Sequence, residues 1–182
     1  EEKVKLIETA VREAREKTHV MVGTGSYSTK QTIENTKEAK ELGADMALIV
    51  TPYYNKPTNE GIYRHFEAIA KEVDIPIVVY NIHGRTGKNI ETPTLKKIAS
   101  LKSVVAVKEA SGNINQMMDV LSIVCSERKD FSVMSGDDAI TLPLMVLGGS
   151  GVISVVSNLI PQKVKAMVDF AQHPLLKDST TI

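Results

Sequence analysis

The stretch IPIVVYNIHGRTGKNIETPTLKKIASLKSVVAVK, residues 75–108, decides the fold class. It begins and ends with short apolar runs rich in β-branched residues, Ile75–Tyr80 and Val104–Lys108, which predict two strands. Between them, Thr92-Pro93 predicts a helix start, with the threonine as N-cap and the proline at the first helical position. Near-continuous apolar strands joined by a helical crossover predict a parallel sheet that is covered on both faces.

The same pattern extends in both directions from this unit. Helical patterns separate the runs, whose starts lie mostly twenty to thirty residues apart. Gly43 is typical of a left-handed helix end, and Pro161 predicts the start of the last helix. The further apolar runs are Val20–Val22, Met46–Val50, Phe131–Met134 and Val152–Val156.

Two α/β architectures fit this alternation. An open doubly wound sheet usually has a glycine-rich turn after its first strand and an acidic residue further on, and Gly23-Thr24-Gly25 matches only half of that signature. A closed barrel needs eight strand–helix units, of which about six are present. We therefore expect residues 1–172 to form an incomplete (β/α)8 TIM barrel that lacks about two units, mainly at its front. Residues 173–182 form an unassigned tail.

Composition limits the class of protein. The 22 basic and 22 acidic residues give a formal net charge of zero, so neither nucleic acid nor a membrane surface is an expected partner. No apolar run is long enough to span a bilayer. A single cysteine, Cys125, cannot form an internal disulfide. We expect a cytoplasmic enzyme or binding domain.

Polar residues at the ends of two strands indicate where chemistry takes place. Functional side chains of barrel enzymes lie at the C-terminal ends of the strands. Lys108 ends its run, and alternation predicts that it shares one face with Ala106 and Val104. Burial in an apolar interior would lower the pKa of the lysine and leave the neutral amine that attacks a carbonyl group. For an isolated strand-end lysine, a side chain that leaves the sheet for solvent is the commoner arrangement.

Neighbouring residues strengthen the catalytic interpretation. Tyr80 ends the preceding strand in an equivalent place, where a phenol can transfer protons during imine formation. Arg85 follows in the next loop and is a candidate for binding a substrate carboxylate, although a solvated loop arginine is the default. Two adjacent tyrosines in Thr51–Pro57 indicate a subunit contact. For Asp137-Asp138, helix capping is the preferred interpretation, with acid–base groups as the alternative.

Other features give weaker or negative indications. The glycine-rich segment 148–151 precedes the last strand, so close backbone packing is expected there and not a phosphate site. The four histidines lack the spacing of metal ligands, so no metal site is expected. The histidines are His19, His65, His83 and His173.

Together these segments resemble the dihydrodipicolinate synthase and N-acetylneuraminate lyase family. The matching segments agree in order and spacing and run from about residue 20 to 160. They are GTGSYST (23–29), VTPYYNKP (50–57), VVYNIHGRTG (78–87), AVKEASGN (106–113), SGDDA (135–139) and GGSGVISV (148–155).

The resemblance implies a set of residue roles. Lys108 corresponds to the lysine that forms the Schiff base with pyruvate, and Tyr80 to the tyrosine of the proton relay. Tyr54 corresponds to the tyrosine that a neighbouring subunit inserts into the active site. Arg85 corresponds to the arginine that binds the carboxylate of the aldehyde, and Ile153 to a residue whose backbone carbonyl borders the pyruvate.

The resemblance also implies an activity and an assembly. Arginine at position 85 is typical of synthase-type members, which condense pyruvate with aspartate 4-semialdehyde to 4-hydroxy-tetrahydrodipicolinate in lysine and diaminopimelate biosynthesis. Such enzymes need no cofactor beyond the covalent imine, and they are usually homotetramers built from tight dimers. Feedback-sensitive members hold lysine with an asparagine and a glutamate where this chain has Tyr27 and Gln31, so weak or no inhibition by lysine is expected.

Departures from the family pattern leave alternatives open. His83 and Gly84 stand where proline and serine are common, and no TTGE motif, which grips the pyruvate carboxylate, is found in the sequence. The chain is therefore expected to lack the N-terminal strands and the C-terminal helices of the family. Another pyruvate-dependent aldolase, such as an N-acetylneuraminate or keto-deoxy-sugar lyase, and an inactive truncated fragment remain the alternatives.

Overall fold

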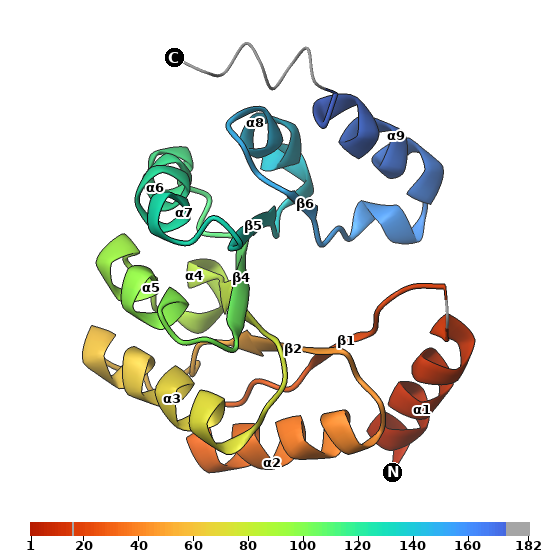
Figure 1. Cartoon of the computed structure of the whole chain (residues 1–182), viewed down its shortest axis with the longest axis vertical. Coiled ribbons are helices and arrows are strands. Elements are labelled where there is room, and N and C mark those ends of the chain that lie inside the picture. Colours follow the sequence, from red (N-terminus) through yellow and green to blue (C-terminus); the bar gives the residue numbers. More distant parts are fainter. Residues whose placement is uncertain (16, 174–182) are drawn as a thin grey trace.

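Six parallel strands form a single sheet in which each strand pairs with the next one along the chain. The computed structural model describes residues 1–15 and 17–173. The row of strands is curved, and helices line its outer side (Figure 1). This arrangement is an incomplete (β/α)8 barrel, as predicted. The strands are β1 Met21–Gly23, β2 Met46–Val50, β3 Ile77–Asn81, β4 Val104–Glu109, β5 Ser132–Ser135 and β6 Gly151–Val152.

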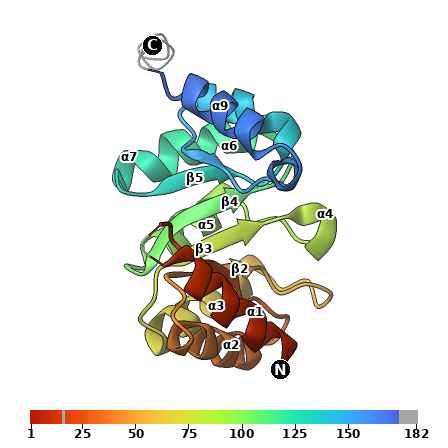
Figure 2. The same ribbon diagram turned by 90° about the vertical axis from the view of Figure 1, so that its right-hand side faces the viewer.

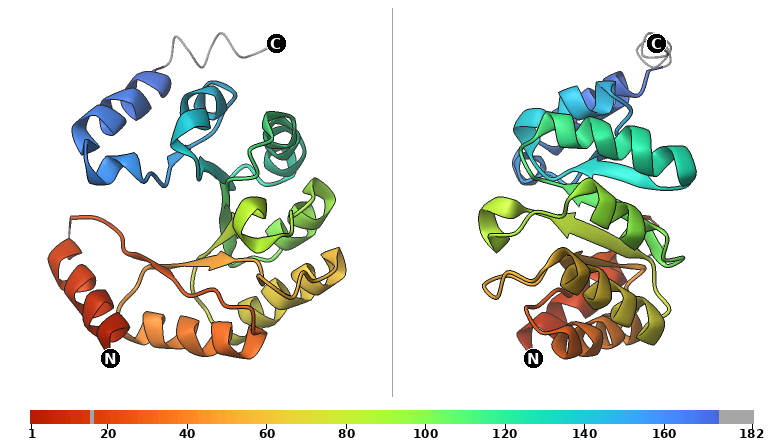
Figure 3. Two further views of the ribbon diagram at one scale, coloured as in Figure 1. Left: turned by 180° about the vertical axis from the view of Figure 1, so that it is seen from behind. Right: turned by 90° about the vertical axis from the view of Figure 1, so that its left-hand side faces the viewer.

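Helices connect successive strands and cover the convex side of the sheet, which Figure 3 shows from behind and from the side. Short 3-10 turns occupy Asp138–Ile140 and Val156–Asn158, and a π-helical turn, Val120–Val124, joins α6 to α7. The helices are α1 Glu2–Ala14, α2 Thr29–Glu41, α3 Asn59–Glu72, α4 His83–Thr86, α5 Thr92–Ala99, α6 Ile114–Asp119, α7 Cys125–Glu127, α8 Thr141–Val146 and α9 Pro161–Ala171.

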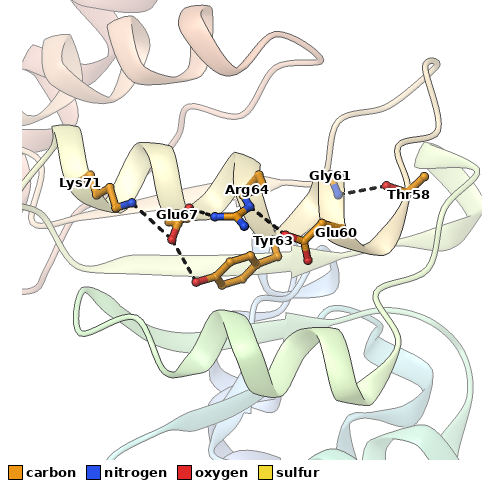
Figure 4. Close-up of polar contacts among 7 residues, drawn as sticks. All are labelled: Thr58, Glu60, Gly61, Tyr63, Arg64, Glu67 and Lys71. Atoms are coloured by element: carbon orange, nitrogen blue, oxygen red, sulfur yellow. Dashed lines mark hydrogen bonds and ion pairs between the residues drawn. The ribbon is translucent and has the colours of Figure 1, made fainter.

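Local sequence explains several of these boundaries. Gly43 follows α2 with a φ of 95°, which confirms the predicted left-handed helix end. Thr58 caps α3 by accepting a hydrogen bond from the backbone N–H of Gly61 (Figure 4). Helix α5 begins one residue earlier than predicted, because Glu91 occupies the N-cap position and Thr92 is already helical.

The outer surface of α3 carries a row of polar contacts that centres on Glu67 (Figure 4). Its carboxylate accepts hydrogen bonds from the Tyr63 hydroxyl at 3.1 Å and the Arg64 guanidinium at 2.9 Å, and Lys71 forms an ion pair with it at 3.3 Å. Glu60 accepts a further bond from Arg64 at 2.8 Å. These contacts at helical spacing stabilise α3 and leave its opposite face free to pack on the sheet.

The main hydrophobic core lies between the sheet and the helices. Phe66, Ile69 and Leu95 are fully buried in it. They pack with strand residues whose side chains point toward the helices, and these strand residues are Ala47, Ile49, Ile77, Val79, Val104, Val107 and Val133. The core therefore holds α3 and α5 on the same side of β2, β3 and β4.

An irregularity in β4 corrects one prediction. Val104 pairs with Ile77, but Ala106 pairs with Val78, so Val105 is an extra residue in the ladder. Val104 belongs to the same helix-side core as Val107, whereas Ala106 does not. The prediction that Val104 shares a face with Ala106 and Lys108 was therefore wrong, because the extra residue interrupts the alternation.

The last strand is also shorter than predicted. Residues 152–156 were expected to be extended, but β6 ends at Val152. The backbone N–H of Ile153 still donates to the carbonyl of Ser135 at 2.9 Å. Beyond it, the Asp138 carboxylate accepts hydrogen bonds from the backbone of Val155 and Val156, which turns the chain into a 3-10 helix. A side-chain acceptor from another loop thus takes the place of a strand partner for these backbone groups.

The loops after β2 and β3 project from one end of the sheet, where the loop preceding α3 and the short helix α4 lie beyond the strands (Figure 2). This end carries the C-termini of the parallel strands.

Most of the predicted tail, residues 174–182, lies outside the described residues. Among residues 1–15 and 17–173, no helix has both the length and the apolar character needed to cross a membrane.

Candidate active site

Lys108 and Tyr80 meet at the C-terminal ends of β4 and β3. The two residues are direct partners in the β3–β4 ladder. Lys108 Nζ lies 4.1 Å from the centre of the Tyr80 ring. Both side chains are partly buried, and they lie on the face of the sheet opposite the helix-side core because their neighbours Val79 and Val107 point into that core. The predicted convergence of the two residues is confirmed.

The surroundings shift the proton affinities of both groups. Burial lowers the pKa of the Lys108 ammonium, and the negative charge of Asp138 opposes that change. Burial raises the pKa of the Tyr80 phenol, while the nearby Arg85 guanidinium acts in the other direction. A lowered amine pKa increases the fraction of neutral amine, which is the nucleophile toward a carbonyl carbon.

Gly136 leaves the space in which the Lys108 side chain lies. A methyl group at this position would stand 2.9 Å from Cε and 3.0 Å from Cγ of Lys108, and 2.9 Å from Cβ of Ala110. Gly136 follows β5 directly, and its backbone N–H donates to the carbonyl of Glu109 at 2.8 Å. The absence of a side chain at Gly136 is therefore necessary for the path that Lys108 takes.

Asp138, whose negative charge acts on Lys108, is hydrogen-bonded to the segment after β6. Its carboxylate accepts a hydrogen bond from the Ser154 hydroxyl and from the backbone N–H groups of Val155 and Val156 at 3.0 and 3.1 Å. These bonds, that from Ser154 foremost, lower the pKa of Asp138. The helix capping predicted for Asp137-Asp138 is confirmed for Asp137, which accepts a hydrogen bond from the backbone N–H of Ala139 at 2.9 Å. It does not hold for Asp138, whose carboxylate binds the segment after β6 instead.

Arg85 and Tyr80 line one cavity of about 380 Å³ at the ends of β1, β2 and β3. Arg85 is exposed on α4. The remaining lining residues are mostly apolar or small: Gly23, Gly25, Leu48, Val50, Tyr53, Ile82 and Thr86. An apolar cavity with a phenol and a guanidinium on its wall suits a small carboxylate substrate.

Tyr54 does not reach Lys108 within the chain. It lies in the loop after β2, is 92% exposed and has a φ of 72°. The next residue but one, Lys56, also has a positive φ, of 43°. Non-glycine residues held in this conformation are uncommon and mark sites of functional interest. The ring of Tyr53 packs edge-to-face against Tyr27 at 5.7 Å between centroids, which holds the base of the loop.

Asn81 and Glu109 form a buried polar pair directly behind Tyr80 and Lys108. Both are fully buried. The side-chain amide of Asn81 donates to Glu109 Oε2 at 3.0 Å and Oε1 at 3.2 Å, and the backbone N–H of Ser111 donates to Oε1 at 2.7 Å. Burial raises the pKa of Glu109, which these hydrogen bonds counteract.

The sequence interpretation missed three of these residues. Asn81, Glu109 and Gly136 lie within the quoted motifs, but none was assigned a role. A polar residue directly after an apolar strand, at the same place in two neighbouring strands, is the signal that points to Asn81 and Glu109. Ile153 is partly buried beside β5, next to Ser135, and its predicted role at the pyruvate stays a prediction. Within the described part of the chain, no group of acidic, histidine or cysteine side chains has the arrangement of a metal site.

The chain is similar in sequence to a known family of enzymes. Residues 1–178 match the dihydrodipicolinate synthetase family. The 4-hydroxy-tetrahydrodipicolinate synthase of Protochlamydia amoebophila is 55% identical over 181 residues, a region that covers 100% of this chain and 60% of that protein. The enzyme of the same name from Geotalea daltonii is 49% identical over 169 residues, 93% of this chain and 57% of that protein. The chain thus spans about 60% of the length of these curated relatives.

The chain is also similar in structure to solved dihydrodipicolinate synthases. Dihydrodipicolinate synthase from Thermotoga maritima superposes with a TM-score of 0.92 at 44% identity, covering 98% of this chain and 61% of that one. The chloride-inhibited enzyme from Acinetobacter baumannii, solved in complex with pyruvate, has a TM-score of 0.91 at 39% identity, with 97% and 59% covered.

Proposed function

Because the chain belongs to the dihydrodipicolinate synthetase family, we propose that the protein which contains it condenses pyruvate with aspartate 4-semialdehyde. The product is 4-hydroxy-tetrahydrodipicolinate, a precursor of diaminopimelate and lysine. The observation that carries the proposal is the contact between Lys108 Nζ and the Tyr80 ring at 4.1 Å, at the C-terminal ends of adjacent barrel strands. The relatives named for this reaction support the choice of substrates.

The first step joins pyruvate to Lys108. The neutral amine attacks the C2 carbonyl carbon, the carbonyl oxygen takes up a proton, and the resulting carbinolamine loses water to give an imine. Tyr80 is the group that moves these protons between nitrogen and oxygen. Its partial burial next to Lys108 supports this role, since a proton then has a short path between the two groups.

Subsequent steps need a carbon nucleophile and a bound aldehyde. Loss of a proton from C3 of the imine gives an enamine, which attacks the aldehyde carbon of the second substrate. We assign to Arg85 the binding of the carboxylate of that substrate through a forked pair of hydrogen bonds, which its place on the cavity wall supports. The imine on Lys108 provides the electron sink, so the proposal requires no separate cofactor.

Tyr54 is assigned to a partner subunit. Its nearly complete exposure and its positive φ in a projecting loop support insertion into the active site of a second copy. We therefore propose a homotetramer built from tight dimers, in which Ile153 borders the bound pyruvate through its carbonyl group. A cytoplasmic location accords with the substrates of this reaction and stays a prediction.

Borohydride trapping tests the proposal. The protein as its gene encodes it is incubated with pyruvate, reduced, digested and analysed by peptide mass spectrometry. We expect a pyruvate adduct on Lys108 that Lys108→Arg abolishes. Lys102→Arg is the matched control, because this exposed lysine lies just before the same strand, and it should leave the adduct unchanged. An adduct on another lysine, or an active enzyme with none, contradicts the assignment.

A further inference from the structure

We infer that the buried pair Asn81 and Glu109 positions Lys108 against Tyr80, by fixing the register of β3 and β4 where the two reactive side chains emerge. The inference rests on the proposed function, since it gives the pair a purpose in the reaction at Lys108. Tyr80 pairs with Lys108 in the ladder, and the next residues along both strands, Asn81 and Glu109, pair in turn. Tyr80 and Lys108 point to the cavity side of the sheet, whereas Asn81 and Glu109 point to the side of the helices.

The orientation of the Asn81 amide is fixed by its surroundings. The backbone N–H of Ile90 donates to Asn81 Oδ1 at 3.0 Å, so the nitrogen of the amide must point toward Glu109. Asn81 Nδ2 also donates to Asn89 Oδ1 at 2.9 Å. Glu109 is therefore required as an acceptor, and its two oxygens receive the Asn81 amide and the Ser111 N–H.

The pair also joins the two loops that leave these strands. Asn89 donates to Gln116 Oε1 at 2.7 Å, and the Gln116 amide donates to the carbonyl of Ile90 at 3.0 Å. The backbone continues the ladder past the strands, where Ala110 N–H donates to the carbonyl of Asn81 at 2.8 Å. The loop after β3, the loop after β4 and α6 are thus held in one network that is buried at Asn81 and Glu109 and partly buried at Asn89 and Gln116.

The Asn81–Glu109 pair is needed to hold the register of β3 and β4 because the ladder between them is irregular. The extra residue Val105 interrupts the pairing at its other end, so the pairing near Ile77 does not by itself set the position of Lys108. A slip of one residue would turn Lys108 to the helix side and Glu109 to the cavity side. Because Asn81 and Glu109 are fully buried, such a slip would also leave both polar groups without partners.

An exchange of the two groups tests the inference. In Glu109→Gln, the shape of the side chain is kept, but its amide nitrogen competes with the Asn81 amide as a donor. In Asn81→Asp, two carboxylates face each other. In the double variant Asn81→Asp/Glu109→Gln, a donor again faces an acceptor and Ile90 N–H keeps its partner. The hydrogen bond that Asn81 donates to Asn89 Oδ1 is lost, because an aspartate at position 81 has no N–H group to donate.

We expect Glu109→Gln to slow trapping of pyruvate on Lys108 by about tenfold to a hundredfold, the size expected for a displaced reactive group. The double variant should recover most of that loss, a coupling that independent sites do not show. Ile98→Val, a conservative change at a fully buried residue of α5, controls for general loss of stability and should trap at the wild-type rate. If Glu109→Gln does not fold, Glu109→Asp replaces it, because it keeps the charge and withdraws the carboxylate from Asn81.

A second readout is independent of activity. Because Lys108 Nζ lies 4.1 Å from the centre of the Tyr80 ring, we expect the ring to shift the NMR signal of the Lys108 ε-methylene group. This signal is identified in isotope-labelled protein by its loss in Lys108→Arg. Glu109→Gln should move this signal and the double variant should return it. An unmoved signal with a wild-type trapping rate overturns the inference, as does a double variant no better than the worse single one. If the wild type traps no pyruvate, the proposed function fails and the NMR signal alone decides the inference.

Discussion

Replacement of Gly136 by alanine tests how the path of the reactive lysine is determined. The added methyl group would lie 2.9 Å from Cε and 3.0 Å from Cγ of Lys108, and 2.9 Å from Cβ of Ala110. Carbon atoms in comfortable contact are about 3.5–4.0 Å apart, so the overlaps are roughly 0.5–1 Å. Rotation of the far end of the lysine does not relieve them, because Cγ lies near the backbone and Ala110 has no rotamers.

Two separate effects follow from this overlap. Overpacking of a well-packed site typically lowers the free energy of unfolding by about 1–3 kcal/mol. A displacement of about 1 Å from the productive geometry costs on the order of a hundredfold in rate. We therefore expect Gly136→Ala to fold but to form the imine with pyruvate about tenfold to a hundredfold more slowly than the wild type.

The assay follows borohydride-trapped adduct with time and records thermal unfolding of the same samples. Gly84→Ala is the matched control: it also adds one methyl group, in the neighbouring helix α4, but no atom lies within 4 Å of the added carbon. That variant should stay within about twofold of the wild type, since the added carbon meets nothing. A folded Gly136→Ala protein with the wild-type rate of imine formation would refute the idea that this glycine fixes the path of Lys108.

Four further predictions concern other parts of the chain. Tyr80→Phe should lower turnover about a hundredfold with little change in pyruvate binding, because a positioned proton donor is lost; steady-state kinetics and circular dichroism check this. Arg85→Ala should raise the KM for aspartate semialdehyde by the equivalent of about 1.5–3 kcal/mol, and a defect confined to pyruvate would contradict its role. Burial lowers the pKa of His65 from 6.5 to about 4, so the unfolded chain binds more protons between these values. The contribution of His65 to the free energy of unfolding should therefore rise by about 3 kcal/mol from pH 4 to 6.5 and level off above. Denaturant titrations of the wild type and His65→Gln give this contribution as their difference. Lysine should inhibit initial rates weakly or not at all, because a phenol at Tyr27 and a neutral amide at Gln31 stand where feedback-sensitive members of the family have a small amide and a carboxylate; inhibition below millimolar concentrations would refute this.

Much of the fold could be predicted because burial on two faces leaves a strong pattern in the sequence. The run Met46–Val50 matches β2 at both ends, and Val104–Lys108 misses only the last residue of β4. Prediction failed where a contact distant in the sequence determines the conformation. Residues 152–156 have the composition of a strand, but the Asp138 carboxylate accepts hydrogen bonds from the backbone N–H groups of Val155 and Val156, and β6 ends at Val152.

In the candidate site too, features that follow from the strand pattern could be predicted, and features that depend on contacts distant in the sequence could not. Lys108 and Tyr80 could be brought together from sequence, because parallel strands end at one edge and both residues end a strand. The close packing expected at the glycine-rich segment is confirmed, since a methyl group on Gly149 would lie 2.9 Å from the backbone oxygen of Leu144. The space that Gly136 leaves for Lys108 could not be predicted, because it depends on the distance between two neighbouring strands and leaves no periodic signal.

The extra residue in β4 has a consequence for how this strand could change in length. Val105 stands outside the ladder, while Val104 on one side and Ala106 on the other keep their partners in β3. Deletion of Val105 would join two segments that are already in regular register, so Lys108 would still face the cavity side. Insertions and deletions within a strand normally reverse every side chain beyond them. At this position the strand could lose a residue without turning Lys108 away from the cavity side, so deletion of Val105 should disturb the reactive end less than a deletion elsewhere in β4.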